Sequence, residues 1–147
     1  MSTTGSISAS AFLEAGVFEL DQHFFPRPWK IEDWRGLNPL HHKLFLRKEE
    51  SVLLGFSLFG LLPADETAHL LKICLDPRVR GSGEALLFWG EILQELKESG
   101  VKSIFLEVEE PNLRAIAFYQ KVGFSKLRTI KSYYSDGTSG VTMSLTL

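Results

Sequence analysis

The sequence contains a single cysteine, Cys74, among 147 residues, and one thiol cannot form an internal disulfide. Disulfides stabilise small proteins of oxidising compartments, so this cysteine usage is typical of the reducing cytoplasm. Cys74 stands inside an apolar run, which predicts a buried structural thiol. We therefore expect a cytoplasmic protein that is stabilised by its core.

An excess of charge is missing, and so are long apolar runs. Sixteen basic and eighteen acidic side chains leave a formal net charge of -2, which provides no attraction for a polyanion. No stretch reaches the roughly eighteen apolar residues of a membrane helix. The opening MSTTGSISAS lacks the charged start and apolar centre of a signal peptide. We expect no nucleic acid and no membrane as partners, and a monomer or weak dimer.

Metal-site and nucleotide-binding motifs are lacking too. The four histidines, at positions 23, 41, 42 and 69, show no metal-ligand spacing, and a second cysteine is absent, so we predict no metal. Neither a Walker loop nor the GxGxxG dinucleotide fingerprint occurs. No serine or cysteine nucleophile is indicated by the order of residues alone.

The composition is that of a folded domain, with 44% hydrophobic and 23% charged residues. The length suits one core, so we expect a single domain over residues 9–147. Residues 1–8 are small and polar, and we expect them to form a disordered tail.

Hydrophobic periodicity predicts an α+β fold, an α/β three-layer arrangement in which helices flank a mixed, mostly antiparallel sheet. Helices are expected over residues 9–24, 28–37, 86–96 and 112–122. Strands are expected over residues 42–48, 51–62, 68–75, 101–110, 124–134 and 140–147, with the last two forming a closing hairpin. Residues 68–110 should form a strand, a helix and a second strand, with the two strands parallel.

Aromatic residues are concentrated near the first two predicted helices, at Phe24, Phe25, Trp29 and Trp34. Such a cluster can form part of the core, or it can form one wall of a site for an apolar or peptide-like substrate. Both interpretations stay open at this point.

A glycine-bearing turn joins the apolar stretch LKICLDP, which begins at Leu71, to the amphipathic helix that ends near Leu96. The first N–H groups of a helix have no partner within it, and the positive end of the helix dipole attracts anions. The N–H groups of Gly81 to Ala85 can therefore converge on a phosphate group, with Arg78 and Arg80 pairing with its charge. A glycine-rich helix start without a ligand is the alternative.

At these residues the chain resembles the GNAT superfamily of acyl-CoA N-acyltransferases, whose first motif is Arg/Gln-x-x-Gly-x-Gly/Ala. Arg80, Gly83 and Ala85 match that motif, and LEVEEPNLRAIAFYQKVGF is similar to the second half of the family's domain. The resemblance extends from Leu71 to Tyr134 and is closest to RimI-type enzymes, which acetylate the N-terminal alanine of a ribosomal protein. It implies a GNAT-like fold and acetyl-CoA as cofactor, with coenzyme A as product.

The resemblance also implies which residues hold the cofactor. Backbone bonds to the pantetheine arm and acetyl group are implied for Ile73, Cys74 and Leu75. The pyrophosphate site is implied for Arg80, Gly81, Ser82, Gly83, Glu84, Ala85 and Leu86. Asn112 resembles the asparagine that contacts the cofactor arm, although an asparagine at a helix start is also a common N-cap.

Acetyl transfer to an amine needs a base for the amine and an acid for the leaving thiolate. Glu107 resembles the RimI-type base and Tyr119 the family's general acid. Without the resemblance, Glu107 reads as an exposed strand residue and Tyr119 as part of the core. These alternatives stay open.

The acceptor side is indicated by shorter matches. Trp29, Tyr133 and Tyr134 resemble residues at the peptide entrance of RimI-type enzymes, but Ser139 and Gly140 stand where the family has an acidic pair. The resemblance implies acetylation of the α-amine at a protein N-terminus, such as the N-terminal alanine of a ribosomal protein. A small-molecule amine as acceptor, and a noncatalytic acyl-CoA-binding module, are the alternatives.

Overall fold

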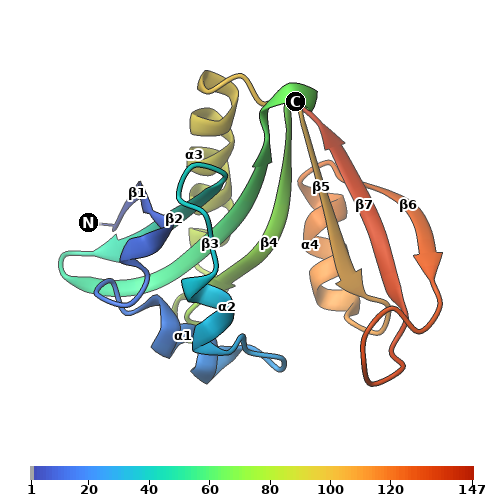
Figure 1. Ribbon diagram of the computed structural model, residues 1–147, viewed down its shortest axis with the longest axis horizontal. Coiled ribbons are helices and arrows are strands. Elements are labelled where there is room, and N and C mark those ends of the chain that lie inside the picture. The colour runs from blue at the N-terminus through green and yellow to red at the C-terminus, as the bar shows by residue number, and fades with distance from the viewer. Residues whose placement is uncertain (1) are drawn as a thin grey trace.

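The computed structural model describes residues 2–147 and contains one seven-stranded sheet in the order β1-β2-β3-β4-β5-β7-β6 (Figure 1). Its strands are β1 (Ser2–Ser8), β2 (His42–Glu49), β3 (Val52–Leu62), β4 (Thr67–Leu75), β5 (Ser103–Glu109), β6 (Ser125–Ile130) and β7 (Gly140–Thr146). The β4 and β5 strands pair in parallel and all other neighbours are antiparallel. The expected mixed, mostly antiparallel sheet is confirmed.

The first strand differs from the sequence prediction. We expected residues 1–8 to form a disordered tail, but Ser2–Ser8 pairs antiparallel with β2 along its whole length, from Ser2 opposite Glu49 to Ser8 opposite Lys43. Met1 lies outside the described residues. The small polar side chains carry no signal for a strand, and the unpaired edge of β2 supplies the backbone partners instead.

Four helices cover the sheet: α1 (Val17–Phe24), α2 (Ile31–Arg35), α3 (Glu84–Glu98) and α4 (Leu113–Lys121). The helix expected over residues 9–24 begins only at Val17, because Gly16 adopts a left-handed φ of 81° and interrupts the chain after a 3₁₀ turn at Ala9–Ala11. Among residues 2–147, no helix is both long and apolar enough to cross a bilayer.

Two cores fill the two faces of the sheet. On one face, α3 and α4 pack on the central strands, with Trp89, Ile92 and Ile116 among the buried residues. On the other, α1 and α2 cover β2 to β4, and Trp34 is the largest buried side chain. The alternation along β2, where Phe45 faces the first core and Leu44 the second, is what a strand covered on both sides requires.

The strands β4 and β5 separate halfway along their length. Backbone pairing runs from Thr67 opposite Ser103 to Leu70 opposite Leu106 and ends there within the described residues. The register of β4 against β3 shifts at this position: Leu70 pairs with Phe59 and Lys72 with Leu58, so Leu71 is an additional residue. Figure 1 shows the two strands diverging toward their carboxyl ends, which leaves the edge of residues 71–75 that faces β5 without a strand partner.

Candidate active site

The glycine-bearing turn ends at Gly83, which precedes the first residue of α3. Gly81 and Gly83 have φ values of 81° and 85°, in the left-handed region that glycine adopts readily. Among residues 2–147, no protein acceptor meets the N–H groups of Gly81 to Leu86 in ordinary hydrogen-bond geometry. A built Cβ at either glycine meets no atom within 4 Å, so the space around this turn is open. These groups fit an anion at the start of α3.

The Glu84 side chain is held away from this turn by Arg47, a buried residue of β2. Arg47 Nε donates to Glu84 Oε2 at 2.8 Å, and its Nη1 donates to Glu91 Oε2 at 3.1 Å. Arg47 is only 3% exposed; its contact with Glu84 is mostly buried, whereas the Glu91 carboxylate is half-exposed. The carboxylate of the first residue of α3, beside the predicted phosphate position, is therefore bound by a cation from the sheet.

The two arginines of the turn differ in their partners. Arg78 binds the Asp76 carboxylate through Nε and Nη2, with an Nη2 to Oδ2 distance of 2.7 Å, and these bonds hold the pKa of Asp76 below its ordinary value. We expected Arg78 to pair with the bound anion, but the structure pairs it with Asp76. Arg80, the residue that matches the family motif, is left for that role.

The segment Ile73 to Leu75 presents its backbone to the gap between β4 and β5. Ile73 and Leu75 pack on the α3 and α4 side, whereas Cys74 lies on the opposite side. Burial raises the pKa of the Cys74 thiol to about 12, so it stays a neutral thiol at neutral pH. Among the described residues, its main chain has no strand partner on the β5 side, so this segment can bind a ligand through backbone groups.

Asn112 stands immediately before α4, and its side-chain Oδ1 accepts a hydrogen bond from the N–H of Ala115 at 3.1 Å. The N-cap interpretation of Asn112 is thus confirmed. Its contact with the cofactor arm stays a prediction.

Glu107 lies on β5. Its side chain points to the face of the sheet that carries α1 and α2, whereas the neighbouring Leu106 is buried on the other face. Its Oε2 is 2.5 Å from Nε2 of His69, a residue of β4. Burial raises the pKa of Tyr133, and the nearby Glu107 carboxylate raises it further. The carboxylate is therefore flanked by an imidazole and a phenol.

Tyr119 lies on the other face of the sheet, on α4. Its ring packs edge-on against Phe124 with 5.6 Å between centroids, which places it at the border of the core. Burial, and then the proximity of Tyr134, raise the pKa of Tyr119 to about 12. The phenol is therefore protonated at any ordinary pH and can donate a proton.

The tyrosines of the predicted acceptor side lie beside a cation that the sequence prediction did not single out. Arg27, in the loop between α1 and α2, forms ion pairs with Glu109 of β5 and Asp136 of the β6–β7 loop. Its guanidinium lies 4.8 Å from the centre of the Tyr134 ring, and Tyr133 packs edge-on against Tyr134. Arg27 thus connects the β6–β7 loop, through Asp136 and Tyr134, to the α1–α2 loop.

Trp29 occupies the same loop but has a different set of contacts. Its N–H donates to Asp21 Oδ2 at 2.9 Å, and its ring lies 5.3 Å from that of Trp34 and 5.0 Å from Lys72 Nζ. Trp34 is core, whereas Trp29 is only half-buried. The aromatic cluster therefore serves in part as core and in part as surface beside the gap.

Comparison with known proteins decides the family. Residues 14–124 match the model of the acetyltransferase (GNAT) family. The chain belongs to this family. Membership confirms the expected GNAT fold and the acetyltransferase class.

Full-length relatives are similar to this GNAT chain over nearly all of its length. The [ribosomal protein bS18]-alanine N-acetyltransferase of Haemophilus influenzae is 32% identical over 143 residues, 95% of this chain and 92% of the relative. The Escherichia coli protein of the same name is 29% identical over 141 residues, 93% of this chain and 91% of the relative. The crystal structure of the ribosomal-protein-S18-alanine N-acetyltransferase from Escherichia coli has a TM-score of 0.87 at 24% identity, covers 99% of this chain and 94% of that chain, and has the same fold.

Proposed function

We propose that this GNAT protein transfers acetyl from acetyl-CoA to the α-amine of a protein N-terminus, with the N-terminal alanine of ribosomal protein bS18 as its acceptor. The observation that carries the proposal is the separation of β4 from β5 after Leu70, with Glu107 on one face of the gap and Tyr119 on the other. The bS18-alanine acetyltransferases that match more than nine-tenths of the chain support the choice of acceptor.

The turn and the end of β4 fit acetyl-CoA. The free N–H groups of Gly81 to Leu86, with Arg80 beside them, suit a pyrophosphate, and the open edge of Ile73 to Leu75 suits the amide-bearing pantetheine arm. Asn112 adds a polar group at the start of α4. When bound, acetyl-CoA supplies a thioester carbonyl for attack by an amine.

The chain's own residues then move protons. Glu107 accepts a proton at a carboxylate oxygen from the acceptor's α-ammonium group, which makes the amine nucleophilic. Tyr119 donates its phenolic proton to the leaving sulfur, a role that its raised pKa favours because the phenol stays protonated. Trp29, Tyr133 and Tyr134 line the route by which the peptide reaches Glu107.

A panel of acceptors tests this proposal. Turnover is measured as release of the coenzyme A thiol with four acceptors. The first is a peptide that copies the start of bS18, and the second is the same peptide with its α-amine blocked and with an internal lysine. The third is spermidine and the fourth is an aminoglycoside. We expect turnover with the free α-amine peptide and little with the blocked one. Comparable rates on the blocked peptide would overturn α-amine specificity.

A small-molecule acceptor is the second candidate, and one observation favours it. Arg27 joins the α1–α2 loop to Asp136 of the β6–β7 loop, so an ion pair ties together the two loops between which a bound peptide would extend. Turnover on spermidine or the aminoglycoside alone would select this candidate. Thermal stabilisation by acetyl-CoA with no thiol release on any amine would instead indicate a noncatalytic acyl-CoA-binding module.

A further inference from the structure

His69 and Glu107 belong to neighbouring parallel strands and contact each other at the point where the strands begin to separate. His69 pairs in register with Phe105, two residues before Glu107, so all three side chains lie on one face of the sheet. The imidazole Nε2 lies 2.5 Å from Glu107 Oε2. The imidazole ring also stacks on Phe105, with 4.2 Å between centroids and 16° between planes, which constrains the plane of the ring.

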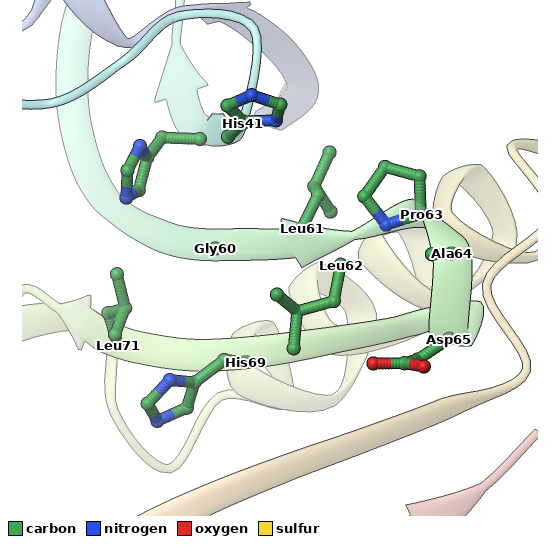
Figure 2. A pocket seen from close by; sticks show the side chains of 10 residues that line it. His41, Gly60, Leu61, Leu62, Pro63, Ala64, Asp65, His69 and Leu71 are labelled. Atoms are coloured by element: carbon green, nitrogen blue, oxygen red, sulfur yellow. The ribbon is translucent and has the colours of Figure 1, made fainter.

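The same histidine lines a cavity of about 520 Å³ at the far end of β3 and β4 (Figure 2). Other lining residues include His41, His42, Asp65, Leu61 and Leu71. His69 itself is about one-quarter exposed on its side chain. The imidazole is thus in contact with the carboxylate on one side and with a solvent-accessible space on another.

We infer that His69 is a positioning residue for Glu107 and also the route by which Glu107 loses the proton that it takes from the acceptor. This inference rests on the proposed role of Glu107 as base. The N–H bond of the acceptor ammonium breaks and an O–H bond forms on Glu107. That proton passes from Oε2 to Nε2, and the imidazolium releases its Nδ1 proton to water in the cavity. After the product leaves, Nε2 gives its proton to water in the vacated acceptor site and Nδ1 takes a proton from water in the cavity, which restores the starting tautomer.

The other ionisable side chains around His69 and Glu107 either form ion pairs with other residues or do not contact the Glu107 carboxylate as a proton acceptor. On β5, Glu109 is held by Arg27, and on β4, Lys72 is held by Asp21. Tyr133 and Tyr134 approach Glu107 from the β6–β7 loop, but burial raises the pKa of both phenols, so they stay protonated and offer no place for a proton. Asp65, His41 and His42 lie around the cavity rather than against the carboxylate. His69 is therefore the group placed to receive the proton.

A merely structural bridge is the alternative, since the pair also ties β4 to β5 where their pairing ends. Such a bridge would change stability and cofactor affinity, and added imidazole would not restore activity. A proton route would reduce kcat, and a diffusible base could replace the missing ring. The two roles therefore predict different responses.

The test uses His69→Ala and His69→Gln in the full chain, with His41→Ala as a matched control that lines the same cavity without touching Glu107. We measure kcat and KM on the acceptor peptide across pH, with graded imidazole. We expect kcat of His69→Ala to fall about 10- to 100-fold with KM for acetyl-CoA little changed. Its pH profile should move, and imidazole should raise its rate in proportion to concentration. The His41→Ala variant should behave as the parent does.

Several outcomes would overturn the inference. One is a kcat close to the parent value in both His69 variants; another is a loss in His69→Ala that imidazole leaves unchanged. If His69→Ala does not fold, His69→Gln decides through its kcat and pH profile. The Glu107→Gln variant separates the two proposals: lost activity there with normal His69 variants removes only the proton route, whereas retained activity removes the role of Glu107 and the route with it.

Discussion

Lys72 Nζ lies 2.6 Å from Asp21 Oδ1, and both residues are almost completely buried, at 5% and 0% exposure. The Lys72 ammonium also lies 4.3 Å from the centre of the Phe25 ring. Asp21 Oδ2 accepts two further hydrogen bonds, from the N–H of Trp29 and from Trp34 Nε1. This ion pair attaches β4 to α1 and to the loop after it, directly beside the proposed site.

Breaking this pair from either side should destabilise the protein. Asp21→Ala and Lys72→Met each leave a buried charge without its partner, and the expected loss is about 3–5 kcal/mol of unfolding free energy. Asp21→Ala should be the more severe because two more hydrogen bonds are lost. Urea unfolding measures the difference. Lys97→Met, at an exposed position of α3, is the control and should change stability by less than about 0.5 kcal/mol.

Replacing Glu107 by Gln should reduce turnover while leaving cofactor binding intact. The amide keeps the shape of the side chain but cannot accept a proton from the acceptor, so we expect kcat to fall about 100-fold or more. Steady-state kinetics with acetyl-CoA titrations measures both quantities. Glu110→Gln is the matched control, since Glu110 is exposed in the turn immediately after the same strand and should leave kcat unchanged. An equal loss in both variants would contradict the assignment.

Tyr119→Phe removes the proposed proton donor, and we expect a kcat about 100-fold lower with normal acetyl-CoA affinity. A pKa of about 12 predicts that Tyr119 causes no fall in the parent's activity below about pH 11. The raised pKa also affects the free energy of unfolding. The stabilisation from the buried neutral phenol is fully present below the pKa of tyrosine in the unfolded chain, near 10, and is lost as pH rises toward the folded-state pKa of about 12. The stability difference between parent and Tyr119→Phe should therefore decrease across that range, as thermal unfolding at several pH values can measure.

Replacing a glycine of the turn should lower the free energy of unfolding, whereas replacing a glycine inside the following helix should raise it. Gly83→Ala forces a side chain into a backbone with φ of 85°, which costs about 1–2 kcal/mol although the space there is open. Gly90→Ala lies inside α3 with ordinary φ and open space, and should gain about 0.5–1 kcal/mol. Thermal unfolding compares the two. Isothermal titration with coenzyme A should show weaker binding only for Gly83→Ala, and weaker binding by both would contradict a specific role of the turn.

The sequence predicted the unit from β4 through α3 to β5 well because each signal there is local. An apolar strand, a turn with glycine and proline, and an amphipathic helix each follow from neighbouring residues, and the motif at Arg80, Gly83 and Ala85 adds a specific resemblance. The paired motif at Glu107 to Phe124 likewise lies in one continuous stretch. The structure has the parallel arrangement that this unit implies.

What the sequence could not predict depends on residues far apart in the chain. The β1 strand forms because β2 offers an edge with unpaired backbone groups. Arg78 forms an ion pair with Asp76 and so is not free to bind the predicted anion. The His69–Glu107 contact joins residues 38 positions apart and depends on the register of two parallel strands. A lysine within an apolar strand, Lys72, was the one local signal that could have indicated a buried ion pair.

The two outermost strands of the sheet also bear on how the protein behaves in concentrated solution. At one side, β1 carries serine, threonine and glycine, and at the other β6 is almost fully exposed and places Lys126 and Arg128 along its length. Short polar strands and charged side chains oppose the addition of a further strand from another molecule. Both open margins of the sheet are thus protected against self-templated fibre growth.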